Sequence, residues 1–212
     1  TLALTLGLWR GEIHNTEARV SCSNTPSDSW QSELGFLRPG DIVFRKGESM
    51  FSAAALALDP QSAFSHVGIV TEADGRILII HSALDEAPGI VDTVRADVVS
   101  RFLAPDRAVA VAVYRLRDEG PEAATKSVLA SRIATGFASR QVRFDRAFDL
   151  ETADAVYCTE LIWRAYRSAG VELVSGEIPS ISFCSNRRKA ILPSTLQSSS
   201  KLQLIWLTSE RN

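Results

Sequence analysis

The pattern of apolar positions predicts a chain whose strands and helices are grouped separately. Apolar runs rich in β-branched residues indicate strands at 42–44, 66–70, 76–81, 109–116 and 202–207. The second and third runs flank Asp74-Gly75, a dipeptide that favours the tight turn of a β-hairpin. The run 109–116 is apolar almost throughout, which is typical of a central strand.

Three segments have helical character. Residues 51–58 are rich in Ala and Leu, and residues 121–138 place Glu122 in a first turn, where the helix dipole favours an acidic side chain. Residues from about 155 to 168 carry apolar positions at helical spacing and end before Gly170, a residue suited to the position beyond a helix. Because the helices are separated in sequence from hairpin-connected strands, we predict an α+β fold with a mainly antiparallel sheet.

The N-terminal part of the chain differs from the rest. Residues 10–33 are polar and rich in turn formers, which predicts an irregular arm. The apolar segment Leu2–Trp9 fits either the end of a leader's apolar core or a half-buried strand. We therefore predict an N-terminal arm or leader remnant at 1–33 and one domain at 34–212.

Composition excludes several classes of protein. The chain has 212 residues and a formal net charge of -2, without the basic stripe of a nucleic-acid-binding protein. No apolar stretch approaches the roughly 18 residues that cross a bilayer. Its three cysteines show no CxxC spacing, which excludes a disulfide scaffold. Gly-rich phosphate loops and HExxH, GxSxG and EF-hand patterns are absent from the sequence, so we predict no cofactor and no metal.

Two histidines fall in the predicted hairpin. A four-residue loop at 72–75 would place His66 directly opposite His81, whereas a two-residue turn at Asp74-Gly75 would place them on a diagonal. In both registers their side chains share one face of the sheet, because side chains alternate with period two, whereas a three-residue loop without a bulge would put them on opposite faces. Either histidine alone is more often a hydrogen-bonded core residue, but two adjoining imidazoles indicate a site.

Cys158 has a setting that Cys22 and Cys184 lack. It lies near the start of the third predicted helix, where free backbone N–H groups and the helix dipole stabilise a thiolate. Cysteine is also often simply buried, as a small hydrophobic residue, and we interpret the other two in this way. Cys158, His66 and His81 form a candidate set of nucleophile, base and orienting group. Zinc held by the same three residues would match no usual ligand spacing.

Several motifs follow one another in a specific order: Leu37-Arg-Pro-Gly-Asp-Ile-Val-Phe44, Ser65-His-Val-Gly-Ile-Val70, Phe144-Asp-Arg-Ala-Phe148, Tyr157-Cys-Thr-Glu-Leu-Ile-Trp163 and Leu192-Pro-Ser-Thr-Leu196. In this order they resemble the circularly permuted papain-like amidases of the YiiX/YaeF type. That family is related to the NlpC-type cell-wall endopeptidases and, more distantly, to lecithin–retinol acyltransferase. The resemblance runs from about Leu34 to Trp206, and the histidine and cysteine motifs are its most specific parts.

The resemblance implies a papain-like fold, in which a sheet or small barrel packs against helices and the nucleophile lies at a helix N-terminus. It implies that Cys158 is the nucleophile, His66 the general base and His81 the third member. YiiX-type members tend to carry a carboxylate at this third position, and a histidine there is closer to the NlpC-type and acyltransferase pattern. We expect Tyr157 either to line the site or to pack on the sheet. Glu160 is expected either to meet a cationic substrate group or to serve as a first-turn carboxylate.

From this resemblance we predict a thiol-dependent hydrolase that cleaves an amide bond in a peptide, in peptidoglycan or in an acylated amine, through an acyl-thioester. Two alternatives stay open. One is an acyltransferase or lipid hydrolase, which would have a long apolar groove; residues 51–58 could form one wall of it, although burial in the core is the more common fate of such a segment. The other is a non-catalytic binding module. No nucleic-acid partner is expected, the sequence leaves the oligomeric state open, and the bacterial cell envelope or periplasm is favoured over the cytoplasm.

Overall fold

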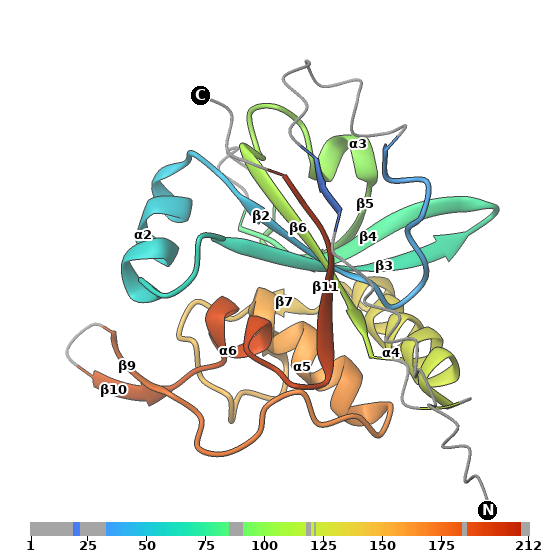
Figure 1. Cartoon of the computed structure of the whole chain (residues 1–212). Coiled ribbons are helices and arrows are strands. Elements are labelled where there is room, and N and C mark those ends of the chain that lie inside the picture. The colour runs from blue at the N-terminus through green and yellow to red at the C-terminus, as the bar shows by residue number, and fades with distance from the viewer. Residues whose placement is uncertain are drawn as a thin grey trace, which may run out of the picture.

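The centre of the molecule is a seven-stranded sheet (Figure 1). The computed structural model describes residues 19–21, 33–84, 91–117, 120, 122–183 and 186–208. In spatial order the strands are β1 (Arg19–Ser21), β11 (Leu202–Thr208), β6 (Ala110–Leu116), β2 (Ile42–Lys46), β3 (His66–Ala73), β4 (Arg76–Ser82) and β5 (Val94–Val98). The strands from β11 to β5 are antiparallel neighbours, and β1 pairs with β11 in parallel. The predicted α+β class with a mainly antiparallel sheet is confirmed.

Helices cover both faces of this sheet. They are α2 (Met50–Leu58), α3 (Val99–Phe102), α4 (Glu122–Ser139), α5 (Cys158–Ser168) and α6 (Pro193–Gln197). Figure 1 shows α4 and α5 beneath the sheet and the short α3 on its other side. Ile42 and Ile69 belong to the apolar core that includes α5, whereas Val43 and Val70 belong to a second core with Phe102 of α3. Among the described residues, no helix is long and apolar enough to span a membrane.

The predicted hairpin forms with its two-residue turn. Ala73 pairs with Arg76, and Asp74 and Gly75 have φ angles of 51° and 69°. Two consecutive left-handed residues make the kind of turn that matches the twist of paired strands, and Asp-Gly adopts it readily. The diagonal arrangement of the two hairpin histidines is therefore the correct alternative.

The helix that carries the cysteine begins later than predicted. It starts at Cys158 rather than near residue 155, because Tyr157 is extended, with ψ of 174°. The two residues before it form β8 (Ala155–Val156), which pairs in parallel with β7 (Arg143–Phe144). This pairing removes a turn from the predicted helix, and it puts the cysteine in the first helical position. Gly170 has a φ of 78°, as expected beyond a helix C-terminus.

Several elements were absent from the sequence prediction. The short helices α3 and α6 and the small strand pairs carried no clear apolar pattern, and the alternating residues of the edge strand β5 were overlooked. The second small pair consists of β9 (Ser180–Phe183) and β10 (Asn186–Lys189). β1 lies within the arm that was expected to be irregular. The segment Leu2–Trp9, Cys22 and Cys184 lie outside the described residues.

Candidate active site

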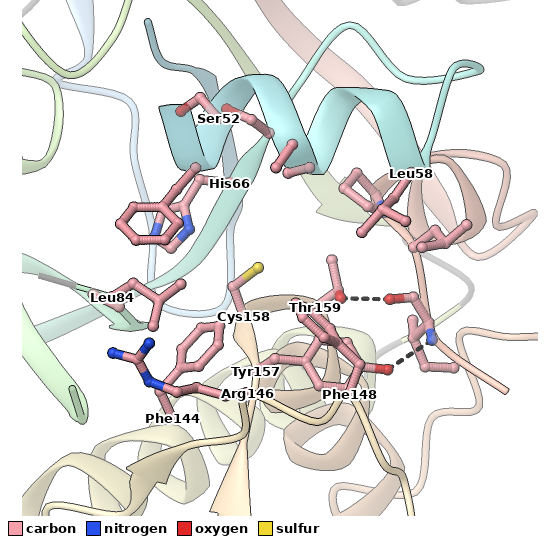
Figure 2. Close-up of a pocket in the computed structure, with 18 of the residues that line it drawn as sticks. Ser52, Leu58, His66, Leu84, Phe144, Arg146, Phe148, Tyr157, Cys158 and Thr159 are labelled. Carbon is pink, nitrogen blue, oxygen red and sulfur yellow. Dashed lines mark hydrogen bonds between the residues drawn. The ribbon is translucent and has the colours of Figure 1, made fainter. Parts of the chain in front are cut away.

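A cavity of about 390 Å³ opens beside the N-terminus of α5. Its walls come from α2, the start of β3, the segment around β7, and the segment that leads into α6. Figure 2 shows the thiol of Cys158 pointing into this cavity, with His66 across from it. These residues meet because α5 begins at Cys158 and β3 begins at His66. The structure thus brings two of the predicted site residues to one cavity.

Behind His66, a chain of hydrogen bonds runs away from the cavity. Nε2 of His66 lies 2.9 Å from Nδ1 of His81, and Nε2 of His81 lies 3.1 Å from Oδ2 of Asp97. His81 is 1% exposed and Asp97 is 4% exposed. In the strand registers, His81 is a diagonal neighbour of both His66 on β3 and Asp97 on β5. All three side chains therefore share one face of the sheet, as the alternation of strand side chains requires.

These hydrogen bonds determine which ring nitrogens carry protons. A carboxylate only accepts hydrogen bonds, so Asp97 requires a proton on Nε2 of His81. The other nitrogen of this neutral ring is then an acceptor, and it accepts the Nε2–H of His66. Nδ1 of His66 is left without a proton. His66 therefore has the tautomer of a general base.

Phe102 and Arg45 hold the two imidazole rings in place. The ring centroid of Phe102 lies 5.7 Å from that of His66 and 5.0 Å from that of His81. The guanidinium of Arg45 stacks on Phe102 at 4.6 Å and donates a 2.6 Å hydrogen bond to its carbonyl oxygen. Since Arg45 is paired directly with His66 in the sheet, its positive charge lies beside the site.

Gly68 gives His81 the space that it needs. The hairpin register puts Gly68 opposite His81. A Cβ atom at position 68 would lie 2.4 Å from Cγ2 of Ile79 and 3.3 Å from Cβ of His81. A larger residue at position 68 would therefore clash with side chains of the neighbouring strand, which explains the glycine two residues after His66.

Burial keeps the two histidines neutral. It lowers the pKa of His66 well below the ordinary 6.5, and the nearby Arg45 adds to this effect. Burial also lowers the pKa of His81 to about 4, against the hydrogen bond to Asp97. Burial alone would raise the pKa of Asp97, but the hydrogen bond with His81 and two neighbouring arginines lower it. At neutral pH the carboxylate is therefore charged and both rings are neutral, as the assigned tautomers require.

Burial raises the pKa of the Cys158 thiol to about 11. The backbone N–H groups of Thr159, Val67 and Cys158 itself act in the opposite direction, as does the charge of Arg45. Their sum is smaller than the cost of removing the thiolate from water. The N–H groups at the helix N-terminus thus lower the pKa of this thiol, as expected, but burial raises it by more. Cys158 and His66 rest as a neutral thiol and a neutral imidazole.

Of the two predicted binding residues, Tyr157 lines the cavity and Glu160 lies elsewhere. The hydroxyl oxygen of Tyr157 accepts the N–H of Ile191 at 2.8 Å. Glu160 is 0% exposed, its Oε2 accepts the N–H of Tyr157, and its Oε1 lies 2.7 Å from Arg164. Burial raises the pKa of this carboxyl to about 7. These contacts make Glu160 a cap on the helix that carries Cys158.

Within the part of the chain that the structure describes, no group of three or more His, Cys, Asp or Glu side chains is placed to hold a metal ion. The histidine pair shows the reason. The nitrogens of His66 and His81 that approach each other share one hydrogen bond instead of pointing at a common ion.

A family model matches residues 36–206 of the chain, and it describes the permuted papain-like amidase enzymes of the YaeF/YiiX, C92 family. The chain belongs to this family. The predicted resemblance is confirmed. The crystal structure of the metalloprotein YiiX from Escherichia coli O157:H7 has the same fold, with a TM-score of 0.62 and 16% sequence identity over 79% of this chain and 96% of that chain. No curated protein sequence matches.

Two residues beside this amidase-family site were missed from the sequence. Asp97 ends the hydrogen-bonded chain, and Arg45 lies next to the base. A signal for Asp97 did exist, since the alternation of Val94, Ala96 and Val98 indicates a short strand after the hairpin. That strand would have placed Asp97 beside His81.

Proposed function

We propose that this permuted papain-like amidase hydrolyses an amide bond with Cys158 as nucleophile and His66 as general base. The observation that carries the proposal is the chain from Asp97 through His81 to His66, which presents an unprotonated Nδ1 in the cavity that the thiol faces. His81 orients His66, and Asp97 is a positioning residue that acts through His81. The three-part logic of nucleophile, base and orienting group is that of other cysteine hydrolases.

The first step transfers the thiol proton to Nδ1 of His66 as sulfur attacks the carbonyl carbon. Both groups rest neutral, so proton transfer accompanies attack and no thiolate accumulates beforehand. The imidazolium formed donates through its Nε2–H to Nδ1 of His81, and the Nε2–H of His81 donates to the carboxylate of Asp97. His66 then gives its Nδ1 proton to the leaving amine, the C–N bond breaks, and an acyl-thioester remains on Cys158. Water then attacks this thioester and gives a proton to His66, the C–S bond breaks, the carboxylic acid leaves, and His66 returns the proton to the sulfur of Cys158.

Backbone N–H groups would stabilise the negative charge of the tetrahedral intermediate. The N–H groups of Cys158 and Val67 face the sulfur. An oxyanion formed on the carbon bonded to that sulfur would lie near both donors. Each such donor contributes roughly 3 kcal/mol to a transition state of this kind.

The E. coli YiiX structure is that of a metalloprotein, and this bears on the choice of chemistry. Among the described residues of the present chain, no group of side chains is placed to hold a metal ion, and the facing nitrogens of His66 and His81 are hydrogen-bonded to each other. The proposed mechanism therefore uses side chains and backbone amides alone.

The test is capture of the acyl-enzyme. The protein is mixed with a panel of N-acyl and N-peptidyl aminomethylcoumarin amides and quenched in acid, and the Cys158 peptide is examined by mass spectrometry. We expect coumarin release and an acyl mass on Cys158. Cys158→Ala should abolish both, and His66→Ala should slow acylation by at least about a hundredfold.

Three outcomes separate this proposal from its alternatives. Unchanged hydrolysis by Cys158→Ala would remove the cysteine from the mechanism. An acyl-enzyme that passes its acyl group to added amines or alcohols much faster than to water would identify an acyltransferase. No hydrolysis by the wild type, with a Cys158 that no electrophile labels, would favour a binding module.

A further inference from the structure

A second cavity, polar and about 170 Å³ in volume, adjoins the largely apolar cavity beside Cys158. The two are neighbours because four residues line both of them, namely Arg45, Ser49, Ser52 and Leu84. Figure 2 shows His66 and Leu84 on one side of the thiol, and Leu58 and Thr159 on the other. The second cavity therefore lies on the His66 side of the thiol.

Arg45 brings a positive charge to this second cavity without a carboxylate to match it. Among the described residues, its guanidinium pairs with no carboxylate and donates one hydrogen bond, to the carbonyl oxygen of Phe102. Arg115, in contrast, donates two hydrogen bonds of 2.7 Å to the carboxylate of Asp41. A guanidinium has five N–H donors, so Arg45 keeps donors for a ligand. A charge held away from water is normally paired, and a ligand's anionic group would pair this one.

Further arginines make the surroundings of Arg45 positive. Burial lowers the pKa of Arg45 to about 10, and the charges of Arg107 and Arg95 lower it further. The charge of Asp97 opposes these effects without cancelling them. The surroundings thus disfavour the positive charge of Arg45, and a bound anion would reverse this.

Two carboxylates also line the second cavity, but both are exposed. Glu48 is an exposed residue, and the side chain of Asp106 is 77% exposed, with its Oδ2 3.9 Å from Nε of Arg107. Water and salt screen the charges of exposed side chains strongly and those of buried side chains much less. The arginines therefore dominate the electrostatic field inside the cavity.

The remaining wall comes from the start of α2. The hydroxyl oxygen of Ser49 accepts the N–H of Ser52 at 3.2 Å and caps the helix. A Cβ atom at Gly47 would lie 2.4 Å from the hydroxyl oxygen of Ser52, so the glycine leaves this hydroxyl its place in the cavity wall. Hydroxyl groups and the N-terminus of a helix both favour a bound anion, in addition to the arginines.

The direction of the reaction places part of the substrate next to this cavity. In the proposed mechanism His66 protonates the leaving amine, so the amine lies on the His66 side of the thiol. We propose that the second cavity binds a carboxylate or phosphate group of the amine through Arg45 and Arg107, so that the scissile amide joins an acyl group to an anionic amine such as an amino acid. Arginine binds either anion with two parallel hydrogen bonds. This inference rests on the proposed function, which supplies the orientation of the amide.

Substrates that differ only in the charge of the amine test this preference. The acyl group that acylates Cys158 fastest is coupled to glycine, to glycinamide and to aminomethylphosphonate, and the released amine is measured by mass spectrometry. We expect kcat/KM for the better of the two anionic amides to exceed that for the glycinamide amide by about tenfold or more. The better one identifies carboxylate or phosphate as the preferred anion. Added salt should reduce the preference.

Two arginine substitutions make a matched pair. Arg107 lines the second cavity, whereas Arg132 is exposed on α4 and lies outside the lining. Arg107→Gln should lower the ratio of kcat/KM for the anionic and neutral amides by about tenfold, and Arg132→Gln should keep this ratio. Arg45→Lys retains the charge but loses the fork of donors, so it should lower the ratio by about threefold. Both substrates use the same catalytic groups, so general damage to the site cancels in the ratio.

Two results would overturn the inference and leave the proposed function standing. One is equal kcat/KM for the anionic and neutral amides in the wild type. The other is a preference that stays undiminished in both Arg107→Gln and Arg45→Lys.

If Cys158 is acylated by no amide, the proposed function fails, and a binding measurement still decides the inference. Cys158→Ala is titrated calorimetrically with hippurate, which is N-benzoylglycine, and with its neutral amide. We expect hippurate to bind about tenfold more tightly or better. Arg107→Gln should remove this difference and Arg132→Gln should keep it, each combined with Cys158→Ala. Equal binding of the two compounds, or no binding of hippurate, would overturn the inference.

Discussion

Nε2 of His81 lies 3.1 Å from Oδ2 of Asp97, and this contact decides which nitrogen of His66 can act as a base. A carboxylate can only accept, so it holds the His81 proton on Nε2 and turns Nδ1 toward His66 as an acceptor. The carboxylate of Asp97 thus determines, through His81, which nitrogen of the His66 ring carries the proton. A carboxylate thus lies behind the histidine at the third position of the candidate site.

Asp97→Asn should therefore damage catalysis without removing any reacting group. An asparagine can donate to Nε2 of His81, which moves the His81 proton to Nδ1 and forces His66 to carry its proton on the cavity side. We expect kcat to fall by about 10- to 100-fold, the range typical of residues that orient a ligand or base. Nitrogen chemical shifts of the imidazoles should report the exchanged tautomers.

Asp106→Asn is the matched control for this variant, because the Asp106 side chain is 77% exposed. It should have wild-type kcat and wild-type imidazole shifts. A normal kcat in Asp97→Asn, in a protein whose tautomers have changed, would remove Asp97 from the mechanism. Equal tautomers in the variant and the wild type would show that the assigned proton positions are wrong.

The reactivity of Cys158 toward iodoacetamide should depend steeply on pH. Because burial raises its thiol pKa to about 11, the thiolate is a minor species below this pH and grows about tenfold per pH unit. Alkylation should rise in the same proportion from pH 7 to pH 10. Peptide mass spectrometry separates Cys158 from Cys22 and Cys184.

His66→Ala provides the second half of that experiment. In a neutral pair, loss of the imidazole should change alkylation by no more than about threefold while amide hydrolysis falls by at least a hundredfold or so. The activity of the wild type should persist below pH 6.5, since burial lowers the pKa of His66 well below that value. A plateau of alkylation between pH 6 and pH 8 that His66→Ala removes would show a preformed ion pair instead.

The hairpin and its two histidines could be predicted from sequence because their determinants are local. Because side chains alternate along a strand, both imidazoles share one face whether the loop has two or four residues, and Asp74-Gly75 provides the two-residue turn. For Asp97 the sequence indicates a strand but does not show that this carboxylate is buried. In β5 the apolar Val98 is 43% exposed and the charged Asp97 is buried, the reverse of what hydrophobicity predicts. What packs against an edge strand decides its burial, and here that is His81 and α3.

The apolar cavity lay similarly beyond the sequence pattern. Residues 51–58 were considered as one wall of a groove, but burial in the core was the favoured interpretation of such an apolar helix. The start of α5 also depended on a distant partner, because Ala155–Val156 pairs with β7. The candidate residues could therefore be proposed from residue types, whereas the surroundings of the site depend on long-range packing.

Gly68→Ala should disable the site through steric pressure alone. The new Cβ would lie 3.0 Å from the carbonyl oxygen of Ile80 and 2.4 Å from Cγ2 of Ile79, so β4 must shift and carry His81 with it. We expect a loss of about 1–3 kcal/mol in the free energy of unfolding and a larger relative loss of activity. Denaturant unfolding and kcat measure the two effects.

Gly35→Ala is the control, because no atom lies within 4 Å of a Cβ built there. It should leave both stability and kcat unchanged. A Gly68→Ala protein with full activity would contradict the idea that close approach of the two strands positions His81.

Glu160→Gln should separate the structural role of this residue from a role in substrate binding. Burial raises the pKa of the folded carboxyl to about 7, above its value in the unfolded chain, so folding favours the protonated form. The carboxyl therefore opposes folding increasingly as pH rises from 4.5 to about 7, and the effect is constant above that pH. A neutral glutamine can still accept the N–H of Tyr157, so the variant should be more stable than wild type at pH 8.5 by about 1–2 kcal/mol, and the two should be equal below about pH 4. Activity should be unchanged, and Glu151→Gln, on an exposed residue, should alter neither property.

Lower stability of Glu160→Gln at pH 8.5 would show that the ion pair with Arg164 outweighs burial. A rise in KM without loss of stability would show that Glu160 contacts the substrate.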